Sequence, residues 1–298
     1  MYGVIDIGSN TIRLAVYQIN EQSLKPLFNK KNVAGLAGYV DENNNMSKEG
    51  IEVAIESIKK VLKLAKKVGV KKVYPFATAS LRNINNSKEA IEIIEKACDI
   101  HVDLISGNDE ARLDFNGAAS DYPYPNGVLV DIGGGSTEVL FFKEKEIVYS
   151  KSFPIGGLNT YKKSVKNIVP DTEELYEMSK KAEDIFSEIP VPDEYKNGVT
   201  CFVGGAGRCA KKLLKKNFED VESKDTYDAN YISLYLQEYE NNPRKVIDDI
   251  LKTIPERINT IIPGLVIIKA ITDKLESAYI FTCKKGIREG YLMEKISR

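Results

Sequence analysis

The stretch VLVDIGGGSTEVLFF, residues 128–142, decides the fold class of this chain. An apolar strand runs into three consecutive glycines, and a second apolar strand follows directly. The opening of the chain, YGVIDIGSNTIRLAVYQI (2–19), has the same order of strand, DIG turn and strand. Such a repeat indicates two copies of one α/β unit that face each other across a central cleft. Since strands and helices also alternate elsewhere, we predict an α/β fold with helices flanking central sheets.

The predicted elements divide into two domains. Strands are expected at 72–78 and 101–105. Helices are expected at 47–68, with Ser47 as N-cap, at 87–98, from 106 or 107 onward, and at 171–188. A strand–turn–helix unit is expected at 199–216, and a helix-rich tail follows it. The segment DYPYPNG (121–127) interrupts the alternation with two prolines and an Asn-Gly pair. We therefore expect domains at 1–123 and 124–298, with a C-terminal helix near 286–298 that packs back on the first domain.

Composition excludes several classes of protein and of site. No apolar run approaches the ~20 residues of a membrane span, and the N-terminus lacks a signal peptide, so we expect a cytoplasmic protein without a membrane partner. Lys and Arg total 42 against 43 Asp and Glu, so the protein has no overall positive charge that would favour binding of nucleic acid. A long polyanion would have to bind in a local basic groove. Four cysteines without a CxxC pair favour free thiols. The single histidine, His101, excludes a His-rich metal centre and is expected as an apolar strand residue.

The DIGGGST loop has the residues of a phosphate site with a metal. Glycines permit backbone conformations that bring amide N–H groups close to an anion, and successive N–H groups form an anion-binding nest. Hydroxyl groups add donors, and flanking carboxylates can hold Mg²⁺ or Mn²⁺ directly or through water. The loop therefore predicts phosphate ligands at Gly133, Gly134, Gly135, Ser136 and Thr137, and metal ligands at Asp131 and Glu138.

The DIGSN loop repeats this chemistry with fewer glycines. Asp6 is expected to face the same metal or its waters, and Ser9, Asn10 and Thr11 are expected to donate to phosphate. No Lys-Ser or Lys-Thr follows the glycines of either loop, so neither is a Walker loop. Because each loop leads into a strand rather than a helix, neither is a dinucleotide fingerprint.

Three further segments stay open when the residues are considered alone. Asp109 and Glu110 favour an ordinary stabilising role, because acids at a helix start meet the positive end of its dipole. Arg82 is suited to bidentate phosphate contact and equally to an exposed loop. VGGAGR (203–208) either binds a phosphate or nucleotide at a helix N-terminus or permits close helix packing. The lysines in KKLLKK (211–216), which follow it, are either a solvated face or a track for a polyanion.

The ordered motifs resemble those of a known family. DIGSNTIRL, ATASLRN, SGNDEARL, DIGGGSTE, PIGGLN, PERINTIIPG and GIREG occur between residues 3 and 292. This set closely resembles the exopolyphosphatase and guanosine-pentaphosphate phosphohydrolase family. The resemblance implies two ribonuclease-H-like domains, as in the actin-like ATPase superfamily. It also implies the short form of the family, which lacks the extra C-terminal domains of longer members.

The resemblance implies a function and roles for the residues. It makes Glu110 the general base, places Asp131 and Glu138 at the metal and the attacking water, and directs Arg82 to substrate phosphate. The expected reaction is Mg²⁺-dependent hydrolysis of the terminal phosphoanhydride of inorganic polyphosphate. The alternatives are hydrolysis of guanosine pentaphosphate and a non-hydrolytic nucleotide- or alarmone-binding module. A homodimer is compatible with the resemblance, although no segment predicts one. This chain has Asp109–Glu110 where the family usually has two glutamates.

Overall fold

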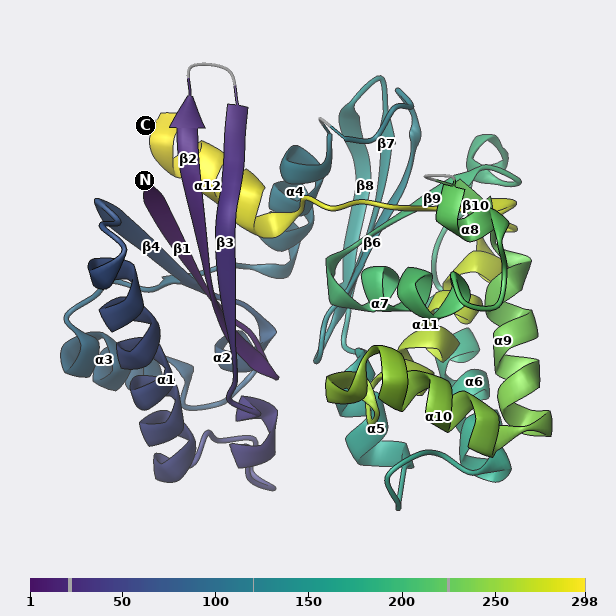
Figure 1. Cartoon of the computed structure of the whole chain (residues 1–298), viewed down its shortest axis with the longest axis horizontal. Coiled ribbons are helices and arrows are strands. Elements are labelled where there is room, and N and C mark those ends of the chain that lie inside the picture. Colours follow the sequence, from purple (N-terminus) through teal and green to yellow (C-terminus); the bar gives the residue numbers. More distant parts are fainter. Residues whose placement is uncertain (21–22, 120, 224–225, 298) are drawn as a thin grey trace. The chain divides into compact units, whose positions relative to one another are not determined.

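The computed structural model describes residues 1–20, 23–119, 121–223 and 226–297, and its contacts divide the chain into two compact units (Figure 1). Unit 1 comprises Met1–Leu113 and Ile287–Arg298, and unit 2 comprises Asp114–Gly286. The expected boundary after residue 123 lies further along the chain. Residues just after 113 belong with unit 2 because the rings of Phe115 and Tyr122 pack against Phe142, with centroids 4.9 and 5.6 Å away.

The sheet of unit 1 has five strands in the order β3-β2-β1-β4-β5. β2 runs antiparallel to β1 and β3, whereas β1, β4 and β5 are parallel. The strands are β1 (Tyr2–Ile7), β2 (Thr11–Asn20), β3 (Ser23–Val33), β4 (Lys72–Ala77) and β5 (Asp103–Leu104). The short β5 leaves His101 outside the strand with 81% of its side chain exposed, so the expectation of an apolar strand residue was wrong.

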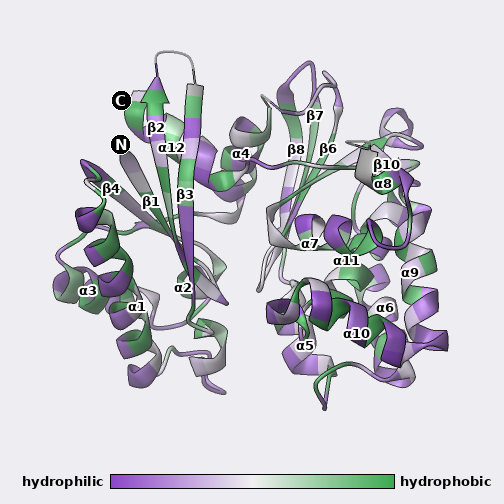
Figure 2. Ribbon diagram, viewed as in Figure 1, coloured by the Kyte–Doolittle hydropathy of each residue, from purple (hydrophilic) through white to green (hydrophobic). Residues whose placement is uncertain are grey.

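Two layers of helices cover the sheet of unit 1. They are η1 (Leu36–Tyr39), α1 (Lys48–Lys67), α2 (Ala79–Arg82), α3 (Ser87–Cys98), α4 (Gly107–Ala118) and α12 (Ile287–Ser297). The residues of α4 from Asp114 onward belong to unit 2. α1 begins at the expected cap, because the Ser47 hydroxyl accepts a hydrogen bond from the amide of Gly50. The apolar faces of α1 and α3 pack on one face of the sheet, around residues such as Ile5 and Ile58. Figure 2 shows α1 with both hydrophobic and hydrophilic residues, as expected of a helix with one buried face.

The second layer of unit 1 contains the helix at the end of the chain. Tyr291 and Leu292 of α12 are buried in a cluster with Val4 and Phe76 of the strands. The Tyr291 hydroxyl donates to the carboxylate of Asp103 at 2.5 Å, and Lys295 pairs with the same carboxylate. Burial alone would raise the pKa of Asp103, but these hydrogen bonds outweigh it and lower the pKa. The helix near the C-terminus is therefore an integral part of unit 1.

Unit 2 contains a second sheet with the same core topology. Its order is β10-β11-β9-β6-β7-β8, in which β7 is antiparallel to its neighbours and β6, β9 and β11 are parallel. The segment β8-β7-β6-β9-β11 thus reproduces β3-β2-β1-β4-β5 in order and direction, which is the ribonuclease-H-like arrangement, and the predicted fold class is confirmed. The strands are β6 (Gly127–Ile132), β7 (Thr137–Lys143), β8 (Glu146–Phe153), β9 (Val199–Val203), β10 (Thr226–Asp228) and β11 (Tyr279–Thr282).

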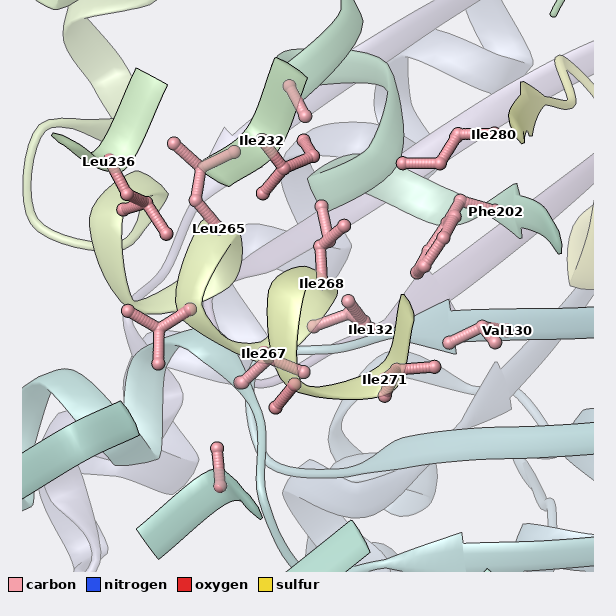
Figure 3. Close-up of a cluster of buried hydrophobic side chains, with 14 of the residues drawn as sticks. Val130, Ile132, Phe202, Ile232, Leu236, Leu265, Ile267, Ile268, Ile271 and Ile280 are labelled. Atoms are coloured by element: carbon pink, nitrogen blue, oxygen red, sulfur yellow. The ribbon is translucent and has the colours of Figure 1, made fainter. Parts of the chain in front are cut away.

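The core of unit 2 lies between this sheet and a group of helices. They are α5 (Gly157–Ser164), α6 (Thr172–Phe186), η2 (Asp193–Tyr195), α7 (Gly204–Leu214), α8 (Asp220–Ser223), α9 (Asn230–Asn241), α10 (Pro243–Thr253), η3 (Pro255–Arg257) and α11 (Ile261–Lys274). α11 is apolar on nearly all sides because other elements enclose it. Figure 3 shows Ile268 and Ile271 of α11 near Ile132 and Val130 of β6. Among the described residues no helix is both long and apolar enough to cross a bilayer.

Candidate active site

In unit 1, the predicted site residues lie where parallel strands end. The DIGSN loop follows β1, the short helix α2 with Arg82 follows β4, and α4 with Glu110 follows β5. The carboxyl ends of parallel neighbours lie at one edge of a sheet, which is the usual ligand edge of α/β folds. The Ser80 hydroxyl donates to the carbonyl of Ile7 at 2.8 Å and so holds α2 against the end of β1.

Glu110 and Arg82 form a nearly buried ion pair. Nη1 of Arg82 lies 2.7 Å from Oε2 of Glu110, and it also donates to the carbonyl of Ile105 at 2.8 Å. The side chains are 17% and 9% exposed. The neighbouring Asp109 is instead 52% exposed and bonds the Ser106 hydroxyl. The structure thus separates two carboxylates that the residues considered alone left equivalent, and it places Arg82 where it orients Glu110.

Asp6 lies among cations as well as beside the loop. Oδ2 of Asp6 is 3.8 Å from Nε of Arg288 on α12, and Arg13 is its cross-strand partner in β2. Asp6 thus has an arginine as a neighbour on each of two elements, and its role as a metal ligand stays a prediction.

The two glycine-rich loops share one backbone turn. In the DIGSN loop the amide of Gly8 donates to the carbonyl of Thr11 at 3.0 Å. In the DIGGGST loop the amide of Gly133 donates to the carbonyl of Ser136 at 2.9 Å. Counted from the aspartate of each DIG, these are the same positions. The sequence repeat is therefore also a repeat of local conformation.

In both loops, backbone carbonyls bind amides of the segment that follows the third strand of the sheet. The carbonyls of Ser9 and Asn10 accept from residues 34, 35 and 37 at the start of η1. The carbonyl of Gly133 accepts from Gly157, and that of Gly134 accepts from residues 158 and 159, at the start of α5. The C=O and N–H of a trans peptide point in opposite directions. With the carbonyls directed to α5, the N–H groups of residues 134 and 135 point away from that helix, as an anion nest requires.

Asn159 completes this arrangement, and its role was not predicted from the sequence. Its Oδ1 accepts from the amide of Gly156 at 2.7 Å, and its Nδ2 donates to the carbonyls of Gly135 at 2.9 Å and Pro154 at 3.2 Å. Gly156 is also required, because a Cβ there would lie 2.7 Å from the carbonyl oxygen of Gly133. The motif PIGGLN carried the signal, since its glycines and asparagine lie just after the third strand of the repeat.

Asn159→Asp is expected to lower phosphate release while leaving the fold largely intact. The carboxylate can still accept from Gly156, but it repels the carbonyls of Gly135 and Pro154, and this distorts the loop. We expect kcat/KM to fall by about tenfold or more, at a cost of roughly 1–3 kcal/mol in stability. Asn85→Asp is the control, because Asn85 makes a similar bond on an exposed loop of unit 1. Equal kcat/KM for Asn159→Asp and wild type would contradict the assigned role.

Two predicted phosphate ligands of the second loop are buried. The Thr137 hydroxyl donates to the carbonyl of Ile155 at 2.6 Å, and the residue is 0% exposed. Ser136 is 3% exposed. The Thr137 hydroxyl thus connects β7 to the turn after β8, and it donates its proton to a backbone carbonyl of unit 2. The glycines at 133–135 remain the main candidates for contact with phosphate.

Asp131 and Glu138 form a carboxylate pair next to the loop. They are cross-strand partners on β6 and β7, and side chains at such positions have Cβ atoms about 5 Å apart. Oε1 of Glu138 accepts from the Ser152 hydroxyl at 2.7 Å, which orients this buried side chain. Within the described residues no three His, Cys, Asp or Glu side chains are grouped to hold a metal. Mg²⁺ is commonly bound by one or two carboxylates with waters and substrate phosphates, so this pair fits the ion.

The VGGAGR segment begins at the end of β9, where Val203 is the partner of Asp131 in the neighbouring strand β6. Gly204 follows β9 with a φ of 74°, and a Cβ there would lie 1.9 Å from Oδ1 of Asp131. Arg257 was not predicted as a site residue. Its guanidinium packs against Gly205, with Nη2 2.7 Å from the position that a Cβ would occupy. The glycines therefore permit close approach of these two side chains, and a cation lies at the start of α7. The signal for Arg257 was present in the motif PERINTIIPG.

Two curated relatives have sequences similar to that of this chain. The chain is 27% identical, over 98% of its length and 46% of the relative, to the bifunctional 3-dehydroquinate synthase/phosphatase of Fusobacterium nucleatum. It is 31% identical to exopolyphosphatase 1 of Mycobacterium tuberculosis over 52% of this chain and 46% of that protein. The chain thus spans about half the length of the curated relatives it matches.

Solved structures show the same fold. An exopolyphosphatase from Cytophaga hutchinsonii superimposes with a TM-score of 0.83 at 22% identity, covering 99% of this chain and 97% of that one. A Ppx/GppA family member from Aquifex aeolicus gives 0.80 at 23% identity, with the same coverage. The family model for the Ppx/GppA phosphatases matches residues 15–298. This chain therefore belongs to the Ppx/GppA phosphatase family.

Proposed function

We propose that this chain hydrolyses the terminal phosphoanhydride of inorganic polyphosphate and releases orthophosphate. The observation that carries the proposal is the loop at 133–136, whose carbonyls bind the start of α5 and whose N–H groups point the other way. Such a loop suits the oxygens of a phosphate chain. The same turn in the DIGSN loop supports a second set of phosphate contacts. Membership of a phosphatase family supports hydrolysis over binding alone.

The proposed roles follow from burial and charge. Glu110 accepts a proton from the attacking water, and its ion pair with Arg82 orients the carboxylate. Asp131 and Glu138 would hold a Mg²⁺ or Mn²⁺ ion, which would neutralise charge on the transferred phosphoryl group. The backbone amides of the loops bind phosphate oxygens, so positioning and electrostatic stabilisation provide most of the rate. Arg82 serves as a positioning residue for Glu110.

A substrate comparison tests the proposal. Phosphate release is measured from long polyphosphate, short polyphosphate and guanosine pentaphosphate, each with and without Mg²⁺. We expect turnover on polyphosphate that requires the divalent ion. A strong preference for guanosine pentaphosphate would show that polyphosphate is not the substrate, although the proposed hydrolysis of a terminal phosphoanhydride would still hold. Tight nucleotide binding with negligible turnover on all three would overturn the hydrolytic function.

A further inference from the structure

Two of the four cysteines lie side by side in unit 2. Cys201 is in β9, and Cys283 follows β11, its parallel neighbour. Register places Cys201 opposite Phe281, and the amide of Cys283 donates to the carbonyl of Phe202 at 2.9 Å. Side chains at 201, 281 and 283 therefore lie on one face of the sheet. The two thiols are in hydrogen-bonding contact. Because Cys283 lies two residues beyond the direct partner of Cys201, a disulfide also requires the backbone at the end of β11 to move toward β9.

The surroundings make the two thiols unequal. The hydrogen bond from Cys201, helped by the amide of Lys285 and the guanidinium of Arg208, outweighs burial and lowers the pKa of Cys283. Burial raises the pKa of Cys201. The thiolate is the nucleophilic form, so Cys283 is the sulfur that reacts first with an electrophile. Cys201 is then in place to resolve the product.

The pair lies close to two sensitive parts of the chain. Cys201 is followed within three residues by Gly204, which makes room for the carboxylate of Asp131. Cys283 is followed within four residues by the point where the chain leaves unit 2. Sγ of Cys283 is also 3.9 Å from Oδ2 of Asp121, and Asp121 pairs with Lys285 at 3.0 Å. A covalent bond at this place would pull on the Gly204 turn and on the exit from unit 2.

We propose that Cys201 and Cys283 form a reversible disulfide when the protein meets a peroxide, and that the disulfide lowers catalytic turnover. The Cys283 thiolate attacks one peroxide oxygen, the O–O bond breaks, and the departing oxygen takes a proton, which leaves a sulfenic acid. The Cys201 sulfur then attacks that sulfur, the S–S bond forms, and the S–O bond breaks. The released hydroxide combines with the Cys201 proton as water. The two thiols are oxidised, and the peroxide is reduced.

The other two cysteines provide internal controls. Cys98 is partly exposed in unit 1, and Cys209 is buried on α7. Neither has a thiol partner among the hydrogen bonds described, and the Cys98 sulfur instead contacts the carbonyl of Ile55 at 3.8 Å. Because Cys201 and Cys283 are both 0% exposed, their oxidation requires local opening and proceeds more slowly than modification of Cys98.

Peptide mapping tests the disulfide independently of any activity. The full chain is treated with hydrogen peroxide, its remaining thiols are blocked with N-ethylmaleimide, and tryptic peptides are analysed without reduction. We expect a linked pair of peptides 197–208 and 275–284 that dithiothreitol separates. Cys201→Ser is expected to trap the sulfenic acid at Cys283, which dimedone labels. Because the buried pair reacts more slowly than Cys98, the treatment is continued for many times the period that oxidises Cys98 completely. Absence of the linked pair from protein that is still folded after this treatment would overturn the proposal.

The effect on turnover rests on the proposed function and is measured separately. Oxidised wild type is expected to lose several-fold in phosphate release from polyphosphate and to regain it with dithiothreitol, whereas Cys283→Ser keeps its rate after peroxide treatment. A linked peptide pair with unchanged turnover would overturn the regulatory part. If the reduced protein released no phosphate from any substrate, the proposed function would fail, yet the peptide result would stand on its own.

Discussion

Glu110→Gln is expected to reduce phosphate release by about 10²–10⁴-fold, the range that a general base contributes. The amide oxygen of the new glutamine can still accept a hydrogen bond from Nη1 of Arg82, as Oε2 of Glu110 does at 2.7 Å in wild type. The proton acceptor is lost, however, and the attacking water keeps its proton. The measurement is kcat for polyphosphate at saturating substrate, with circular dichroism and a thermal melt to establish the fold.

Asp109→Asn is the matched control for this experiment. Asp109 precedes Glu110 on the same first turn of α4, but it is half exposed and bonds Ser106 and Arg112. A substitution there is expected to change turnover by less than about threefold, since surface changes cost little. If both variants lost activity equally, the loss would result from a disturbed start of α4 rather than from removal of the general base. Wild-type turnover in Glu110→Gln would remove Glu110 from the mechanism.

Gly204→Ala is expected to combine a large loss of activity with a moderate loss of stability. The residue has a φ of 74°, which costs an L side chain about 1–2 kcal/mol. Its new Cβ would also occupy space 1.9 Å from Oδ1 of Asp131, so that carboxylate must turn away. Because Asp131 is proposed to hold the divalent ion with Glu138, the Mg²⁺ concentration for half-maximal turnover should rise about tenfold or more.

The readouts separate displacement of Asp131 from simple destabilisation. A destabilised but correctly arranged site would keep the wild-type Mg²⁺ dependence and lose only folded protein. Gly198→Ala is the control, because a Cβ there meets its nearest neighbour at an ordinary 3.6 Å. We expect that variant to match wild type in both turnover and Mg²⁺ dependence. An unchanged Mg²⁺ dependence in Gly204→Ala would contradict the role of Asp131.

The sequence predicted the fold where patterns are local. The two DIG turns, the Ser47 cap and the alternation of elements all depend on neighbouring residues, and they predicted the repeated sheet. β3 was not predicted, because Pro26 and several lysines make SLKPLFNKKNV unlike a buried strand. As an edge strand, β3 tolerates this composition, since a proline there removes no essential ladder hydrogen bond.

The candidate site was harder to predict because its contacts join distant segments. Arg82 and Glu110 are 28 residues apart, so their ion pair could not be inferred from either motif. Asn159 and Arg257 act on glycine loops far from them in sequence, and only the folded chain brings each pair together. Thr137 was assigned to phosphate on its chemistry, yet its hydroxyl bonds the carbonyl of Ile155, a partner that only the tertiary structure supplies.

The position of α12 has a consequence for the order in which the protein folds during synthesis. Residues 1–113 leave the ribosome first, but the cluster around Val4, Phe76 and Leu113 also contains Tyr291 and Leu292 of α12. Unit 2 is continuous in sequence and is complete once residue 286 has emerged. The later unit can therefore finish first, while the earlier one keeps an apolar face uncovered until its last helix arrives.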